Sequence, residues 1–121
     1  MLSAQFVTFL RSPQPSRSFE FYESLGLQLA LDQGGCRIYQ VSSSAYLGVC
    51  EGTTPDPPSL LCLTWVVEDV DGWYDRFVQL GVPTDGPPRE NPEYRIYHFF
   101  ATDPDGYRLE VQRFLDPAWQ G

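Results

Sequence analysis

Few side chains in this sequence could make or break bonds. Its single histidine is His98, and its three cysteines, Cys36, Cys50 and Cys62, show no CxxC spacing. One histidine cannot supply the donor set of a typical catalytic zinc site. Cys62 has no assured base beside it, and a thiol in that setting is more typical of packing than of nucleophilic catalysis. These residues favour a binding site over a catalytic one.

Composition and charge narrow the class of protein further. The chain has 121 residues and a net charge of −8, from sixteen acidic and eight basic side chains. This balance argues against a nucleic-acid partner, which needs clustered Lys and Arg, and it is compatible with a cationic ligand or simply with solubility. No apolar run reaches the roughly 18 residues of a membrane span, and residues 1–10 lack the basic start of a signal peptide. The odd cysteine count predicts reduced thiols, without a disulfide framework, in a cytoplasmic protein.

Hydrophobic patterning predicts a strand, a helix and three further strands in the first half. Residues 5–10 are β-rich, and a helix follows with Ser16 as N-cap and Gly26 just beyond its end. Phe19, Tyr22 and Leu25 recur at helical spacing within it. The predicted strands that follow cover residues 27–31, 36–41 and 45–50.

The same order begins again after a proline-rich linker. A strand is predicted at residues 60–67, and a helix capped by Asp69 or Asp71 ends at Gly81. The later strands are predicted at residues 82–84, 95–101 and 107–114, the last two joined by a tight turn at residues 103–106. This internal repeat predicts one domain of two βαβββ modules, an α+β fold whose curved mixed sheet surrounds a cleft. The predicted parts are module one at 4–51, linker at 52–59, module two at 60–115 and tail at 116–121.

Short motifs in this order resemble those of the vicinal oxygen chelate superfamily, which contains glyoxalases, bleomycin-resistance proteins and dioxygenases. The motifs are Phe21-Tyr22 with Leu25-Gly26-Leu27, residues 67–71, and Phe99-Phe100 followed by Asp103-Pro104-Asp105-Gly106 and Leu109-Glu110. In that family the first strand of each module and the last strand of the chain supply metal ligands. The matching positions here are Phe6, Cys62 and Glu110, and a shift of one residue would offer Gln5 or Val7 in place of Phe6. Phe6 has no donor atom, so the resemblance implies a member without the metal.

Strand alternation predicts which side chains share the cleft face. With Phe6 and Glu110 pointing inward, Val7, Phe9, Leu63, Trp65, Tyr97 and Phe99 should pack under the helices. His98 either contacts a ligand or is bonded to a neighbouring strand or to Glu110. Phe6 and Phe100 either line an open cleft or fill it. The predicted ligand-binding set is Phe6, Thr8, Tyr39, Tyr46, Cys62, Thr64, His98, Phe100, Arg108 and Glu110, with Gln112 on the same face.

Aromatic rings with one carboxylate predict binding of a planar or cationic molecule. The leading hypothesis is therefore a metal-free, homodimeric small-molecule-binding protein that sequesters an antibiotic or a metabolite, without a cofactor. The alternative is a metal-dependent lyase, isomerase or ring-cleaving dioxygenase in which Glu110, with Gln5 or Cys62, holds Zn, Ni, Mn or Fe. A third hypothesis is an accessory or regulatory module that uses the fold as a dimer platform.

Overall fold

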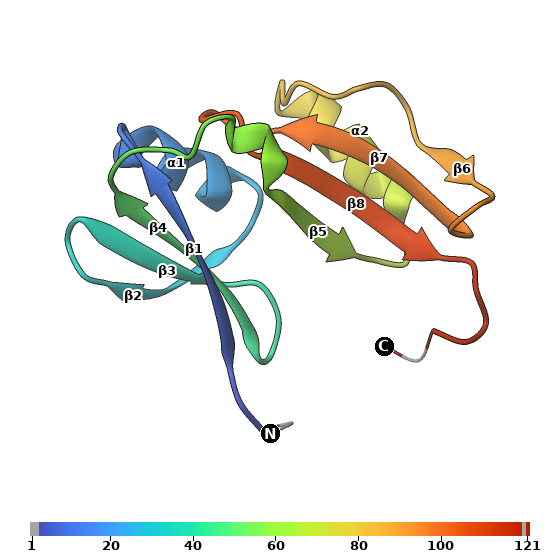
Figure 1. Cartoon of the computed structure of the whole chain (residues 1–121), viewed down its shortest axis with the longest axis horizontal. Coiled ribbons are helices and arrows are strands. Elements are labelled where there is room, and N and C mark those ends of the chain that lie inside the picture. Colours follow the sequence, from blue (N-terminus) through green and yellow to red (C-terminus); the bar gives the residue numbers. More distant parts are fainter. Residues whose placement is uncertain (1–2, 120) are drawn as a thin grey trace. The chain divides into compact units, whose positions relative to one another are not determined.

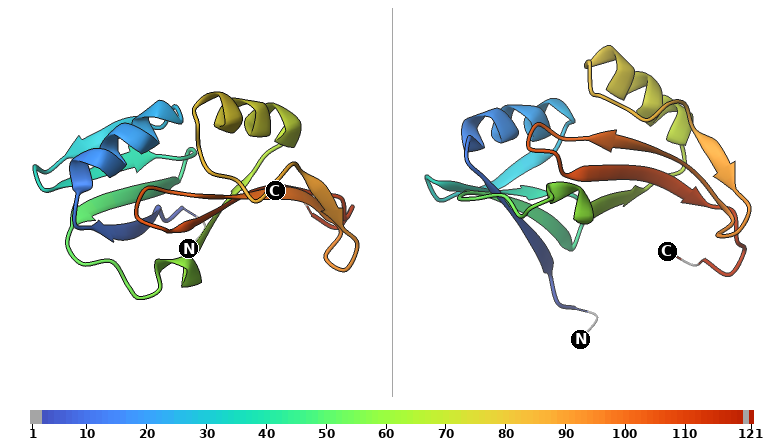
Figure 2. Two further views of the ribbon diagram at one scale, coloured as in Figure 1. Left: turned by 90° about the horizontal axis from the view of Figure 1, so that it is seen from above. Right: turned by 45° about the horizontal axis from the view of Figure 1, so that its top comes forward.

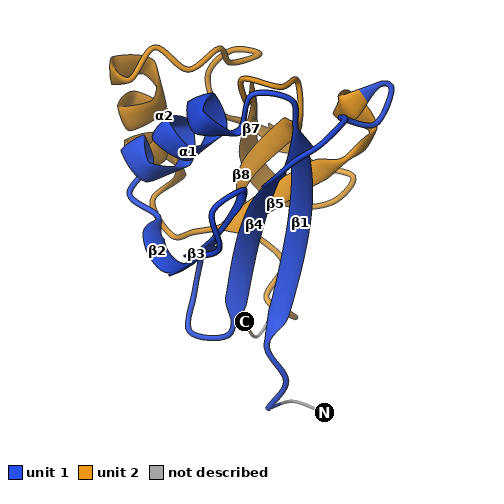
Figure 3. Ribbon diagram, turned by 90° about the vertical axis from the view of Figure 1, so that its left-hand side faces the viewer, with its two compact units in different colours: residues 1–57 blue, residues 58–121 orange. Residues whose placement is uncertain are grey.

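The computed structural model describes residues 3–119 and 121. Residues 1, 2 and 120, which belong to the predicted N-terminal segment and C-terminal tail, lie outside the described residues. The chain forms two compact units, Met1–Pro57 and Pro58–Gly121, and the boundary falls inside the predicted linker (Figure 3). The described part of the chain contains no helix with the length and apolar character that a membrane span needs.

Unit 1 is a four-stranded sheet with one helix on one of its faces (Figures 1 and 2). In the sheet β1 is parallel to β4, and the remaining pairs are antiparallel, in the order β1-β4-β3-β2. The elements along the chain are β1 (Phe6–Ser12), α1 (Pro15–Ser24), β2 (Gln28–Asp32), β3 (Cys36–Gln40) and β4 (Ala45–Glu51).

Unit 2 repeats this topology. Its sheet has the order β5-β8-β7-β6, with β5 parallel to β8 and the other pairs antiparallel. Its elements are η1 (Pro58–Leu60), β5 (Cys62–Val66), α2 (Val70–Gln79), β6 (Arg89–Asn91), β7 (Ile96–Thr102) and β8 (Arg108–Phe114). The predicted α+β fold of two βαβββ modules is confirmed.

The helix ends follow the sequence signals with one exception. Gly26 and Gly81 follow α1 and α2 with φ of 96° and 74°, a region that glycine adopts without a Cβ clash. Asp69 is the N-cap of α2, and its side chain accepts a hydrogen bond from the Gly72 N–H. The prediction of Ser16 as the cap of α1 is wrong, because that helix begins at Pro15, whose fixed φ suits the first helical position.

The predicted strand at residues 82–84 is also wrong. Only a single bridge joins Thr84 to Ala101, and the sixth strand lies later in the chain, at Arg89–Asn91. Proline has no N–H to donate to a ladder. The segment that contains Pro83, Pro87 and Pro88 therefore crosses beside β7 without forming a strand.

The turn between β7 and β8 is built by the Asp103 side chain. Its Oδ1 accepts hydrogen bonds from the N–H groups of Asp105 and Tyr107, both at 2.9 Å. Gly106 has a φ of 93°, and its N–H donates to the Asp103 carbonyl. The tight turn predicted from the sequence is confirmed, and it fixes the pairing of the two strands that carry His98 and Glu110.

Asp103→Ala should lower the free energy of unfolding by about 2 kcal/mol, because Asp103 is 5% exposed and its loss removes the acceptor of two backbone N–H groups. Urea unfolding followed by fluorescence measures the change. Asp103→Asn keeps the acceptor oxygen and should lose less than half as much. Equal losses in the two variants would show that the hydrogen bonds do not hold the turn.

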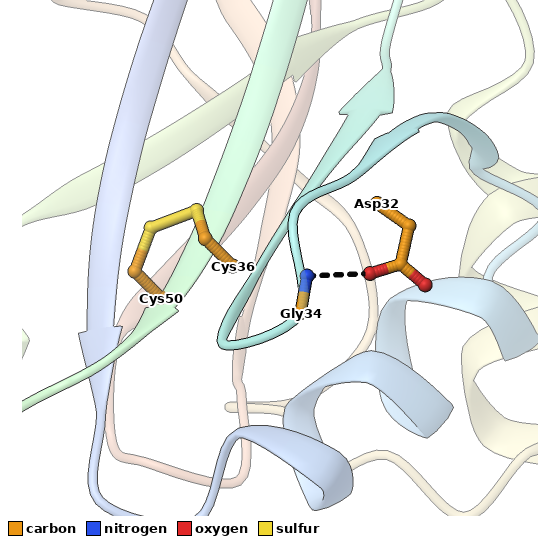
Figure 4. The surroundings of a disulfide bond; sticks show 4 residues. All are labelled: Asp32, Gly34, Cys36 and Cys50. Carbon is orange, nitrogen blue, oxygen red and sulfur yellow. Dashed lines mark hydrogen bonds between the residues drawn. A yellow bond between two sulfur atoms is a disulfide. The ribbon is translucent and has the colours of Figure 1, made fainter.

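Two cysteines that were predicted to be reduced form a disulfide, Cys36–Cys50, shown in Figure 4. They are opposite each other on the antiparallel strands β3 and β4, with Cα atoms 4.0 Å apart. The Glu51 N–H donates to the Gly35 carbonyl, so Cys36 and Cys50 form a non-hydrogen-bonded pair, the position where side chains approach closely. A count of cysteines could not reveal this pairing, because it depends on the register of the hairpin. The predicted cytoplasmic location thereby loses one of its supports.

Candidate functional site

The sheet of unit 2 has one face covered by α2 and one face without a helix. Tyr97 donates to the Asp71 carboxylate, and the Phe99 ring packs edge-on against Tyr74 and Phe77 of α2. These contacts place the odd-numbered residues of β7 under the helix, as predicted. We call the opposite surface the open face of unit 2. It carries Cys62, Thr64, Val66, His98, Phe100, Arg108, Glu110 and Gln112.

Glu110 is at the centre of the open face, and both of its carboxylate oxygens have partners. The Thr64 hydroxyl donates to Oε1 at 2.9 Å, and His98 Nδ1 lies 2.6 Å from Oε2. The side chains of His98 and Glu110 are only 9% and 13% exposed. Of the two roles predicted for His98, bonding to Glu110 is therefore confirmed, and ligand contact stays a prediction.

Phe100 lies between two polar groups on this face. The His98 ring meets it edge-on at 5.0 Å between centroids, and the Arg108 guanidinium is 4.7 Å from its centroid. Arg108 also makes two hydrogen bonds to the Asp85 carboxylate, at 3.1 and 2.7 Å. The sequence predicted a planar or cationic ligand and left open whether Phe100 lines the cleft or fills it. In the structure a guanidinium of the chain lies against the Phe100 ring.

Cys62 is the free cysteine of the described residues. Desolvation by its neighbours raises the pKa of its thiol, although the residue is exposed, and the Thr64 hydroxyl 3.8 Å away lowers it by a smaller amount. A raised pKa reduces the thiolate fraction, which is the form that attacks an electrophile or binds a metal. The absence of nucleophilic chemistry at Cys62 stays a prediction.

In unit 1 the predicted face is wrong by one residue. Leu10 and Ser12 of β1 are buried on the α1 side, where the Ser18 hydroxyl of the helix donates to Ser12. Alternation then places Phe6 and Thr8 on that same side of the strand, not on the open face. Phe6 itself is 71% exposed at the start of β1. The face of β1 was assigned by matching Phe6 to a ligand position of the family motif. An error of one residue in that match moves every side chain of the strand to the opposite face.

Tyr39 also lies on the helix side of unit 1, contrary to the prediction. It is fully buried, and its hydroxyl donates to the Glu23 carboxylate at 2.6 Å, while Arg37 binds the same oxygen at 3.1 Å. Burial, followed by the hydrogen bond to Glu23, raises the pKa of Tyr39 above the usual range of a phenol. Tyr39 therefore joins β3 to α1 and is a structural residue.

The sheet face of unit 1 that lies opposite α1, its open face, carries the alternate side chains of each strand. Val7 pairs with Tyr46, and the Gln5 side chain donates to the Tyr46 hydroxyl at 3.5 Å. Phe9 is 50% exposed, and its ring lies against Gly48, where a Cβ would overlap it. Tyr46 is thus on the predicted face. The sequence left open whether Gln5 or Val7 takes the place of Phe6 on this face. In the structure the strand has that register, with Val7 on the open face and Phe6 on the other.

Unit 2 brings few possible metal donors together on its open face. Glu110 has both oxygens engaged, and a Cys62 thiol with a raised pKa resists the deprotonation that metal binding requires. Among residues 3–119 and 121, no three His, Cys, Asp or Glu side chains gather in a group that could hold an ion.

Sequence reasoning missed Asp85, which binds Arg108. Asp85 lies in the segment between α2 and β6, where no periodic pattern shows which side chains face the sheet. Its backbone N–H donates to the Phe100 carbonyl at 3.0 Å, and this bond holds the segment beside β7. The clustered prolines indicate a rigid segment between α2 and β6, but they do not reveal the ion pair between Asp85 and Arg108.

Solved structures with this fold include a lyase and a bleomycin resistance determinant. A glyoxalase/bleomycin resistance protein/dioxygenase from Nocardioides has a TM-score of 0.79 at 18% identity, covering 96% of this chain and 88% of the other. For lactoylglutathione lyase from Agrobacterium tumefaciens the TM-score is 0.75 at 20% identity, with 97% and 98% covered. For a bleomycin resistance determinant encoded on the transposon Tn5 the TM-score is 0.76 at 19% identity, with 93% and 98% covered. At these identities the likeness shows the fold alone.

Sequence comparison identifies the family directly. No curated protein sequence matches the chain. The family model described as the Glyoxalase/Bleomycin resistance protein/Dioxygenase superfamily matches residues 4–111, which is most of the chain. The repeated βαβββ units agree with that match, and the chain therefore belongs to the Glyoxalase/Bleomycin resistance protein/Dioxygenase superfamily.

Proposed function

We propose that this chain binds a small planar organic molecule on the open face of unit 2 and that binding, not metal-dependent catalysis, is its function. The observation that carries the proposal is the closed hydrogen-bond network of Glu110, whose two oxygens are held by Thr64 and His98. A carboxylate fixed in this way has a defined orientation for recognising a ligand, and among the described residues no group of three His, Cys, Asp or Glu donors forms a possible metal site.

The surroundings of Glu110 suit a planar ligand. Phe100 is half-buried, and Val66, 44% exposed, adds apolar surface to the same face. Ligand sites combine apolar surface with a few fixed polar groups that set orientation. Drug sequestration is one use of such a site, and a bleomycin resistance determinant has a similar fold. Self-association into a homodimer stays a prediction, which sedimentation at micromolar concentration tests.

A matched series of planar compounds tests the proposal. Calorimetry should detect binding of 2-naphthol, 2-naphthoate or 2-naphthylmethylammonium, which share one ring system and differ in charge, with bleomycin as a drug probe. Phe100→Ala should weaken the binding by about tenfold, the size of one lost aromatic contact. The control is Tyr94→Ala, which removes a 67% exposed ring elsewhere in unit 2 and should have no effect. Equal effects of the two variants, or no binding of any probe, would contradict the proposal.

Metal analysis separates the proposal from the enzyme alternative. After Zn, Ni, Mn or Fe is added and the protein is dialysed, the metal content should remain far below one ion per chain, because the described residues bring together no group of three metal donors. Elemental analysis gives the content, with Glu110→Gln as the reference for ions bound elsewhere. A stoichiometric ion that the Glu110→Gln variant loses would favour a metal-dependent lyase, isomerase or dioxygenase.

A further inference from the structure

Arg108 presents a guanidinium of fixed orientation on the open face of unit 2. Its ring partner Phe100 lies 4.7 Å away, and its two bonds to Asp85 form the side-by-side pattern in which a guanidinium binds both oxygens of a carboxylate. The Arg108 side chain is 25% exposed and remains accessible from solvent. The geometry is that of a carboxylate-binding group whose carboxylate is supplied by the chain.

Asp85 can leave this guanidinium without a change in the backbone. The Asp85 N–H is bonded to the Phe100 carbonyl, and the Thr102 N–H is bonded to the Pro83 carbonyl, so the segment on either side of Thr84 is held to β7. The Asp85 side chain itself is 49% exposed. Rotation of that side chain into water would free both bonding positions of Arg108.

The local charge also favours an anion at this place. Arg108, and more weakly Arg89, lower the pKa of Asp85, which favours the ionised carboxylate beside the Arg108 guanidinium. The net charge of −8 repels anions at long range, but a second carboxylate in the place of Asp85 would meet the Arg108 guanidinium at short range.

We propose that Arg108 binds a carboxylate group of the planar ligand and that Asp85 is an internal competitor which this carboxylate displaces. The inference rests on the proposed function, because it names the charged group of a molecule bound to the same open face. It also makes Arg108 and Asp85 the residues that set ligand specificity: Arg108 selects the carboxylate, and Asp85 limits how tightly it is held.

Removing the competitor tests this directly. Dissociation constants of 2-naphthoate and 2-naphthol are measured by calorimetry for the parent protein and for Asp85→Asn, Asp85→Ala, Arg108→Gln and Arg113→Gln. Both Asp85 variants should bind 2-naphthoate about tenfold more tightly and 2-naphthol unchanged, because the guanidinium is no longer shared. Arg108→Gln should remove the preference for 2-naphthoate over 2-naphthol. Arg113→Gln changes an arginine on the other face of β8 and should leave that preference as it is.

The outcomes separate the two proposals. If 2-naphthol binds in a Phe100-dependent way but the Asp85 variants do not change the ratio of the two constants, the carboxylate inference is wrong and the proposed function stands. If neither compound binds to any of the variants, both are wrong. An equal gain for 2-naphthol in the Asp85 variants would mean that Asp85 blocks the face by its size, and it would also overturn the inference.

Discussion

Replacing Glu110 by leucine is expected to lower the free energy of unfolding by about 3 kcal/mol and to abolish binding on the open face. Glu110 is 13% exposed, and its loss leaves the Thr64 hydroxyl and the ring nitrogen of His98 without their shared partner. Removing this nearly buried carboxylate costs more than one bond, because the His98 side chain stays desolvated, whereas the exposed Thr64 hydroxyl can bind water. Chemical denaturation measures the stability, and calorimetry with 2-naphthol measures the binding.

Two further variants show whether the network acts as a unit. Thr64→Val deletes one bond with little change in shape and should cost about 1 kcal/mol. Glu110→Gln keeps an acceptor but loses the charge, so its effect should lie between those of Thr64→Val and Glu110→Leu. In the double variant Thr64→Val/Glu110→Leu the two losses should not add, because both remove the same bond. Strict additivity would show that the Thr64–Glu110 bond contributes nothing to the stability of the protein.

The sequence was most informative where the signal is local. Gly26, Gly81 and the turn at residues 103–106 mark ends and connections by their own backbone preferences, and all three are where they were predicted. The repeat of strand, helix and strands fixed the topology of both units, because each βαβββ pattern has few ways to cover one sheet face. The open face of unit 2 also followed from alternation, since Glu110 and its companions were placed in the correct register.

The rest depends on register and on contacts between distant residues. In β1 the two faces were assigned from Phe6, and this choice exchanged them. Leu10 and Ser12 are the residues of this strand that are buried, and they mark the covered face. Tyr39 looked like a site residue until its hydroxyl was seen to bond to Glu23. Asp85 is 23 residues from Arg108, in a proline-rich segment without periodicity, so alternation could not bring the two together.

The disulfide is the second feature whose removal should have a large effect. Cys36→Ser with Cys50→Ser should lower the free energy of unfolding by about 3 kcal/mol, because the bond closes a loop between residues 14 apart and so restricts the unfolded chain. Reductant should destabilise the parent protein by a similar amount and leave the double variant unchanged. Cys62→Ser is the matched control, since Cys62 is outside the disulfide, and it should keep the response of the parent to reductant. Alkylation in denaturant, read by mass spectrometry, should label one thiol before reduction and three afterwards; three labelled thiols in protein never exposed to reductant would show that Cys36 and Cys50 are not bonded.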